Sequence, residues 1–123
     1  MKKLITLLLL SFFVTVCGQV NANDYEKIFS KENVLIDVRT PSEYQAGHLK
    51  NAVNIPYDKI KSEIEKLASD KAQTIVVYCR SGRRADIAAK NLTGLGYKNV
   101  INAGRYNELK KLEEKYNASN SGK

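Results

Sequence analysis

A cysteine followed by three arginines is the part of this sequence whose residue types could do chemistry. In the stretch VYCRSGRRAD, Cys79 is followed by Arg80, Ser81, Gly82, Arg83 and Arg84. Cationic side chains beside a thiol favour its ionised form, and the thiolate is the nucleophilic form of cysteine. A glycine lets the loop turn tightly, so that backbone N–H groups at a helix start can converge on an anion. The pattern therefore predicts a thiolate nucleophile in a loop that attracts an anionic substrate.

Cys79 is the only cysteine expected in the exported chain. The sequence opens with two lysines, an apolar run over residues 4–16 and small or polar residues up to Ala22. This order is typical of a secretory signal peptide, so we expect residues 1–22, including Cys17, to be removed. An unpaired thiol in an oxidising compartment favours a reactive, partly exposed cysteine over an inert buried one.

The leader also predicts where the protein resides. We expect a periplasmic protein that begins at Asn23 and keeps no stable insertion in the membrane. One alternative is a membrane anchor, but the apolar run is shorter than the roughly 20 residues that a spanning helix needs. The other is a lipoprotein modified at Cys17, which the bulky Val16 before it disfavours.

The charge of the chain favours small anionic partners. The net charge is +7, and removal of Lys2 and Lys3 with the leader leaves +5, a balance that attracts anionic small molecules. Lysines alternate with glutamates in KIKSEIEKL and ELKKLEEKY, which is typical of solvated helix faces rather than of a nucleic-acid interface. No cluster with the spacing of metal ligands follows the leader, and we expect no cofactor.

Strands and helices alternate along the rest of the chain. The apolar and β-branched runs predict strands over residues 33–38, 52–56, 73–79 and 98–102. The helical patterns cover residues 40–47, 57–69, 84–96 and 106–116. This order predicts a single α/β domain over residues 23–116, with a mainly parallel central sheet flanked by helices and a frayed polar tail over 117–123. Ligands bind beyond the carboxyl ends of such strands, which is where Cys79 lies.

Local signals define the helices in more detail. Thr40 is the expected N-cap of the first helix, with Pro41 in its first turn, Glu43 three residues past the cap and Gly47 at its end. The inward faces of the later helices are expected to be Ile60, Ile64, Leu67 and Ala68, then Ile87, Ala88, Leu92 and Leu95, then Leu109, Leu112 and Tyr116.

Phosphoryl transfer and sulfur transfer both use a cysteine loop of this kind. Cysteine phosphatases carry an arginine six positions after the nucleophile, which closes a loop wide enough for a phosphate. Here that position is Ala85, and the last arginine is Arg84. The tighter loop leaves room for one sulfur atom on the thiolate, so its length favours sulfur transfer.

Two longer segments carry a family resemblance. LIDVRTPSEYQAGHLKNAVNIP resembles the first signature of the rhodanese homology domain, and VVYCRSGRRADIAAKNLTGLGYKNVINAG resembles its active-site region. The two cover most of residues 33–109, and the chain looks most like the small periplasmic single-domain rhodaneses of phage-shock operons. The resemblance implies a thiosulfate sulfurtransferase with a persulfide on Cys79, a CRSGRR backbone that cradles the sulfur, and a thiol or cyanide as acceptor.

The sequence departs from the family pattern in several places, none of them at the nucleophile. Many members have Gly where Asn51 stands, Ser where Ala85 stands, and Gly-Gly and Trp within the segment that here reads NAGRYNEL. The change at Ala85 removes a hydroxyl near the loop and leaves the substrate less defined.

Roles follow for the remaining polar residues. We interpret Asp37 and Arg39 as a salt bridge that organises loops near the site, and His48 as a structural or surface residue. Among the arginines, Arg84 is expected to make the strongest substrate contact. A persulfide carrier or sulfur-sensing module without turnover is the alternative function, and the sequence names neither the physiological donor and acceptor nor the oligomeric state.

Overall fold

The sheet at the centre of the molecule is parallel throughout. The computed structural model describes residues 22–121, so residues 1–21 of the expected leader lie outside it. Within this range the strands are β1 (Val34–Asp37), β2 (Val53–Asn54), β3 (Thr74–Cys79) and β4 (Asn99–Arg105). They form one sheet in the order β2-β1-β3-β4. The predicted α/β domain with a parallel sheet is confirmed.

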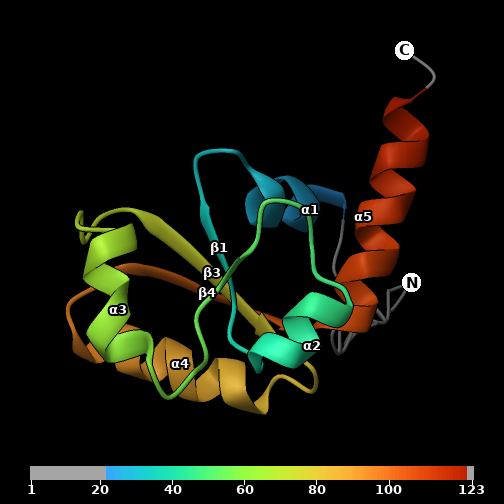
Figure 1. Cartoon of the computed structure of the whole chain (residues 1–123). Coiled ribbons are helices and arrows are strands. Elements are labelled where there is room, and N and C mark those ends of the chain that lie inside the picture. The colour runs from blue at the N-terminus through green and yellow to red at the C-terminus, as the bar shows by residue number, and fades with distance from the viewer. Residues whose placement is uncertain (1–21, 122–123) are drawn as a thin grey trace, which may run out of the picture.

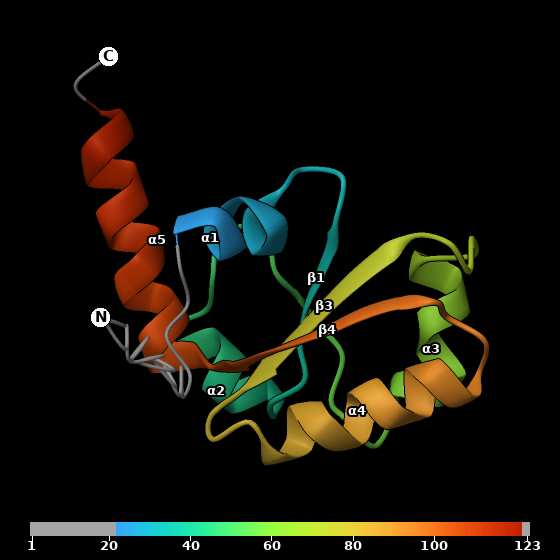
Figure 2. The same cartoon turned by 180° about the vertical axis from the view of Figure 1, so that it is seen from behind.

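Helices cover both faces of this sheet (Figures 1 and 2). They are α1 (Ala22–Phe29), α2 (Pro41–Ala46), α3 (Ile60–Leu67), α4 (Arg83–Gly94) and α5 (Tyr106–Asn120). On one face, α3 and α4 pack on alternate strand residues, in a core that includes Ile36, Ile60, Ile64, Val77, Cys79, Ala88 and Leu92. On the other face, α1 and α5 pack on the intervening residues, in a core that includes Ile28, Leu35, Leu49, Val76, Tyr78 and Leu109. A strand buried on both faces explains why TIVVYC is apolar without alternation.

The order of the strands in the sheet determines where the candidate active site lies. From β1 the chain runs through α2 to β2 on one side, and from β3 it runs through α4 to β4 on the other. The connections leave β1 and β3 in opposite directions, so the ends of these neighbouring strands form a topological switch point, where α/β folds bind ligands. Cys79 is the last residue of β3.

Three residues that were expected to face inward are exposed instead, so these predictions are wrong. Leu67, Leu95 and Tyr116 are 38%, 37% and 42% exposed. Leu67 ends α3 and Leu95 lies beyond the last residue of α4, so neither has a following turn to hold it against the core. Tyr116 instead stacks on Tyr25 of α1, with ring centroids 4.2 Å apart.

Both ends of the domain are more helical than expected. Helix α1, which the sequence analysis does not predict, buries Tyr25 and Ile28 on one side. Helix α5 continues to Asn120, so most of the expected polar tail prolongs this helix. No helix among residues 22–121 has both the length and the apolar character needed to cross a membrane.

Candidate active site

Cys79 is buried at the carboxyl end of β3. Its exposed fraction is 0%, and it packs in the core that lies under α3 and α4. The expectation of a partly exposed thiol is therefore wrong. The residues after the cysteine fold back over it, because α4 begins only four positions later, at Arg83.

One backbone N–H of the loop points at the sulfur. The amide of Gly82 donates a hydrogen bond to the Sγ of Cys79 at 2.9 Å. Gly82 has φ 93° and ψ −16°, a left-handed conformation that favours glycine, and it is the N-cap of α4. Its carbonyl accepts the first helical hydrogen bond, from Asp86 at 3.0 Å. The loop thus points a backbone N–H at the start of α4, one that has no partner within the helix, towards the sulfur.

Arg84 is held by an acid from a different helix. Its two terminal nitrogens donate to the two carboxylate oxygens of Glu43 at 2.7 and 3.0 Å. The hydrogen bonds and charge of Glu43 outweigh burial and raise the pKa of Arg84. The bidentate pair engages the guanidinium that we expected to make the strongest substrate contact, and it links α2 to the start of α4 beside the loop.

Glu43 gains its position from the start of α2. Thr40 is the N-cap of this helix, and its side chain and the carboxylate of Glu43 form a reciprocal capping box, as expected. The hydrogen bonds from Arg84 and those from Thr40 outweigh burial and lower the pKa of Glu43 to about 2. The carboxylate is therefore charged throughout the neutral range.

This pairing predicts an acid-sensitive contribution to stability. The pKa of Glu43 falls from 4.5 to about 2 on folding, so the pair stabilises the fold fully above the unfolded value and progressively less as pH falls towards 2. Glu43→Gln is expected to lower the urea midpoint at pH 6 to 7, with a difference from wild type that shrinks below pH 4.5. Urea unfolding of both proteins across this range measures it. A difference that stays constant from pH 7 to pH 3 would contradict the assignment.

The other loop residues face solvent. Arg80, Ser81 and Arg83 are all exposed. Among residues 22–121 the ion pairs of arginine are those of Arg39 and Arg84, so Arg80 and Arg83 carry unpaired charges. These two residues make the mouth of the loop cationic without contacting the sulfur directly.

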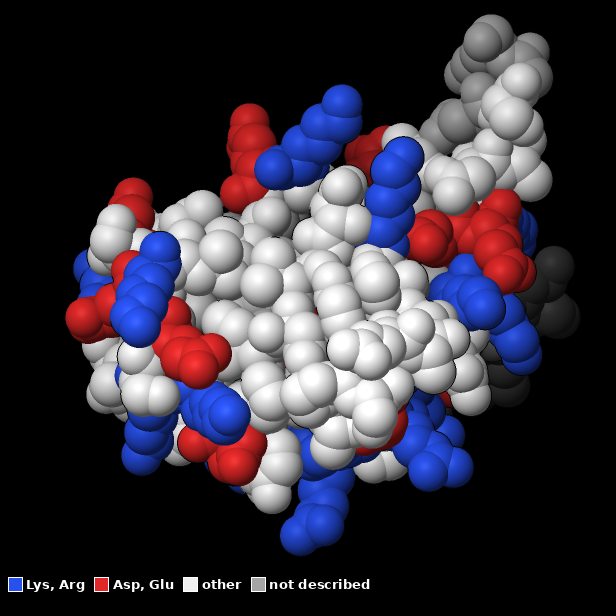
Figure 3. All heavy atoms as spheres, in the orientation of Figure 1, with Lys and Arg blue, Asp and Glu red and all other residues white. Residues whose placement is uncertain are grey.

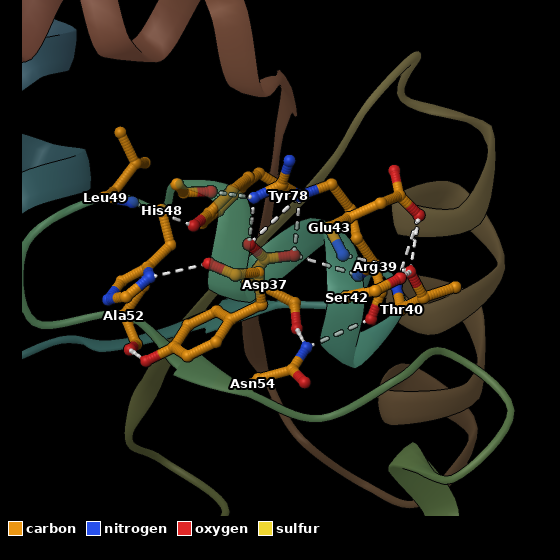
Figure 4. Close-up of polar contacts among 12 residues, drawn as sticks. Asp37, Arg39, Thr40, Ser42, Glu43, His48, Leu49, Ala52, Asn54 and Tyr78 are labelled. Carbon is orange, nitrogen blue, oxygen red and sulfur yellow. Dashed lines mark hydrogen bonds and ion pairs between the residues drawn. The ribbon is translucent and has the colours of Figure 1, made fainter.

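A buried ion pair organises the neighbouring strand end (Figure 4). The carboxylate of Asp37 accepts hydrogen bonds from the backbone N–H of Arg39 at 2.9 Å, and from its Nε and Nη2 at 3.0 and 2.6 Å. The guanidinium also donates to the carbonyl of Gly47 at 2.7 Å and lies 4.2 Å from the ring centroid of Tyr106. Burial disfavours the charge of Arg39, but the hydrogen bonds and charge of Asp37 outweigh it and raise the pKa of Arg39. The expected structural role of this pair is confirmed.

Further polar contacts tie the end of β1 to β2, and the end of β3 to the loop that follows α2. The amide of Asn54 donates to the carbonyls of Asp37 and Arg39 at 3.0 Å each. The hydroxyl of Tyr78 accepts from the backbone N–H of Leu49 at 3.1 Å (Figure 4). These contacts hold the end of β1 beside Cys79. Glu43 of α2 therefore lies next to the active loop, the segment CRSGRR of residues 79–84.

His48 lies outside this network. It is exposed, its ring stacks on that of Tyr44 at 3.7 Å, and its Nδ1 lies 2.9 Å from the carbonyl of Tyr44 (Figure 4). The expectation of a structural or surface role is confirmed.

Charged side chains elsewhere on the surface are mixed in sign. On the face seen in Figure 3, basic and acidic side chains lie side by side over α3, and the centre is uncharged. Two pairs illustrate the mixture: Lys71 with Glu65 at 3.2 Å, and Lys90 with Asp86 at 2.9 Å. This alternation agrees with the interpretation of the lysine-rich helices as solvated faces.

The sequence analysis assigns no role at the site to three residues that the structure places there. Glu43 appears there only as a capping residue, and Asn102 and Arg105 of β4 appear only within the segment NAGRYNEL, without a role at the site. The side-chain amide of Asn102 donates to the carbonyl of Gly82 at 3.4 Å, and Arg105 is paired with Cys79 in the β3–β4 ladder. The sequence signal that could have identified Asn102 and Arg105 was the predicted parallel sheet, because a strand next to β3 must end beside Cys79.

The sequence and the fold both match known proteins. Residues 21–111 match the model of the Rhodanese-like domain family. The Escherichia coli protein named thiosulfate sulfurtransferase PspE is 39% identical over 82 residues, which cover 67% of this chain and 78% of that protein. These matches confirm the predicted resemblance and agree with a sulfurtransferase enzyme.

Two solved structures show the same fold. A rhodanese from Escherichia coli, determined with anions, superposes with a TM-score of 0.60 and 39% identity, covering 62% of this chain and 89% of that one. A human single-domain sulfurtransferase gives a TM-score of 0.57 and 28% identity, with 65% and 82% covered. With its Cys79 loop at the switch point of a parallel sheet, the chain belongs to the rhodanese-like domain family.

Proposed function

We propose that the protein is a thiosulfate sulfurtransferase that carries the transferred sulfur as a persulfide on Cys79. The observation that supports this most directly is the 2.9 Å hydrogen bond from the Gly82 amide to Sγ, within a loop that bears unpaired arginines. A relative named thiosulfate sulfurtransferase and a rhodanese structure determined with anions suggest the same donor class.

The reaction divides into two displacements. The Cys79 thiolate attacks the outer sulfur of thiosulfate, a new S–S bond forms, and the S–S bond of thiosulfate breaks with its electron pair leaving on sulfite. The product is a cysteine persulfide with one negative charge. Cyanide in an assay, or a thiol in the cell, then takes the outer sulfur and restores the thiolate. Splitting the transfer in this way gives ping-pong kinetics.

The protein stabilises the anionic sulfur rather than supplying a base. The N–H of Gly82 is aimed at Sγ before reaction, which is the logic of an oxyanion hole applied to sulfur. His48, the only histidine in the sequence, lies on the surface with Tyr44. Because Cys79 is buried, the donor reaches it only as the exposed Arg80 and Ser81 move aside.

The deciding experiment is an assay of purified residues 23–123 with thiosulfate and cyanide. Steady thiocyanate production with parallel lines in double-reciprocal plots is expected. The alternative, a persulfide carrier, would form stoichiometric persulfide with thiosulfate but would not turn over. Detection of the added sulfur atom by mass spectrometry of the intact protein separates this alternative from an inactive preparation.

We also propose that the chain is exported and cleaved, so that the enzyme acts in the periplasm. The expected N-terminus of the mature protein is Asn23, because small residues lie at the positions before the cut and the apolar run is too short to span a membrane. Intact mass and N-terminal sequencing of the protein from the periplasmic fraction measure it. An N-terminal lipid on Cys17 would show that the lipoprotein alternative is right.

A further inference from the structure

The cations around Cys79 include one that does not belong to its loop. Arg105 is the last residue of β4, and the ladder between the two strands pairs it directly with Cys79. It is exposed, and within residues 22–121 it takes part in no ion pair. Arg84, by contrast, is engaged by Glu43 through both terminal nitrogens.

The strand geometry puts Arg105 on the same face of the sheet as the thiol. Paired residues of neighbouring parallel strands point to the same face, and successive residues of one strand point to opposite faces. Cys79 belongs to the core on the α4 side, whereas Tyr106, the residue after Arg105, packs in the core on the opposite side with Tyr78. Both relations place Arg105 on the α4 side, over the end of β3.

The backbone that carries Arg105 is attached to the active loop. A shift in register between Val77 and Tyr78 adds one residue to β4 just before this point. There, Asn102 donates to the carbonyl of Gly82 at 3.4 Å and accepts from the N–H of Gly104 at 2.9 Å. The Cα of Gly104 lies 3.8 Å from the position that a Cβ on Gly82 would occupy. The loop and the bulge of β4 therefore form one unit.

We infer that Arg105 binds the sulfonate end of the sulfur donor and thereby selects dianionic donors; this rests on the proposed sulfurtransferase function. Neighbouring strands lie about 4.8 Å apart, a distance that an extended arginine side chain spans easily. A thiosulfate whose outer sulfur meets the Sγ of Cys79 has its sulfonate oxygens towards the mouth of the site. The guanidinium fork suits such oxygens, and Arg105 is the unpaired one that the sheet itself positions.

The test compares two donors with the same outer sulfur. Thiosulfate carries two charges, and methanethiosulfonate carries one because a methyl group replaces one sulfonate oxygen. Arg105→Gln is expected to lower kcat/KM for thiosulfate by about ten- to a hundredfold, the loss of one charge-assisted contact, mainly through KM. The loss for methanethiosulfonate is expected to be several-fold smaller. Arg105→Lys keeps the charge and should retain part of the activity.

A matched control removes a positive charge elsewhere. Lys98 is exposed and precedes β4, at the opposite end of the strand from Arg105. Lys98→Gln is expected to change kcat/KM for either donor by less than about twofold, because distant exposed charges are screened. Wild-type kcat/KM for thiosulfate in Arg105→Gln would overturn the inference. Equal losses for both donors, together with a lower melting temperature, would overturn it too, because they indicate a structural role.

Binding of thiosulfate without turnover separates this inference from the proposed function. Calorimetric titration of thiosulfate into Cys79→Ser and into Cys79→Ser/Arg105→Gln is expected to show affinity weakened by a similar factor in the double variant. If the wild-type protein turned over neither donor, the proposed function would fail, yet this weakening would still support the role of Arg105. Equal affinities in the two variants would overturn it whatever the turnover.

Discussion

Cys79→Ser is expected to abolish thiocyanate production while leaving the domain folded. A serine hydroxyl stays protonated under the Gly82 amide and cannot accept a sulfur atom as a persulfide. Serine is close to cysteine in size, so the buried position at the end of β3 is kept without a large cavity. The measurement is thiocyanate formation from thiosulfate and cyanide, with circular dichroism as the check on folding.

A second variant makes this prediction robust. Cys79→Ala also lacks a nucleophile but leaves no hydroxyl in the core, so it keeps the test informative if the serine proves destabilising. Both variants should also fail to gain the mass of one sulfur atom when incubated with thiosulfate. A folded protein of either kind that produced more than a trace of thiocyanate would show that Cys79 is not the sulfur carrier.

Asp37→Ala is expected to destabilise the domain by about 3–5 kcal/mol, because it leaves a buried guanidinium without its counter-charge. Asp37 is 0% and Arg39 5% exposed, and the guanidinium is enclosed further by Tyr106 and the carbonyl of Gly47. Urea unfolding at neutral pH measures the change. Sulfur transfer is expected to fall with the folded population, since the ends of β1 and β3 lie side by side.

Matched variants distinguish the buried pair from ion pairs in general. Asp86 pairs with Lys90 on the surface of α4 at 2.9 Å, and Asp86→Ala is expected to cost less than about 1 kcal/mol. Asp37→Ala/Arg39→Met removes both charges and should recover much of the stability lost in the single variant. A single Asp37→Ala variant as stable as Asp86→Ala would refute the role given to the buried pair.

The acid stability of Glu43→Gln and the donor preference of Arg105→Gln test different parts of the site. The first concerns the pair that holds α2 against the loop, at 2.7 and 3.0 Å. The second concerns a side chain expected to touch the donor. On the proposals made above, Arg84 positions the loop through Glu43, and the main contact with the donor comes from Arg105 on the neighbouring strand.

The sequence alone predicted the strands, all helices of the described residues except α1, and the candidate nucleophile. The run TIVVYC, the capping signals at Thr40 and Glu43, and the glycine after Cys79 are local patterns, and each depends on hydrogen bonds or conformations within a few residues. The alternation of strands and helices then gave the parallel sheet, since a parallel crossover needs a helix between its strands. Together these placed a cysteine at the carboxyl edge of the sheet.

Only the tertiary structure decided the surroundings of that cysteine. Glu43 and Arg84 are 41 positions apart in the chain, and the pairing of Arg105 with Cys79 depends on the strand order and on one extra residue in β4. The burial of Cys79 likewise depends on how the loop packs against the core. Such contacts form between segments that the fold brings together, and periodicity along the chain carries no information on which charged side chain meets which. The family and its sulfur-transfer class were therefore readable from the sequence, and the partners of each arginine were not.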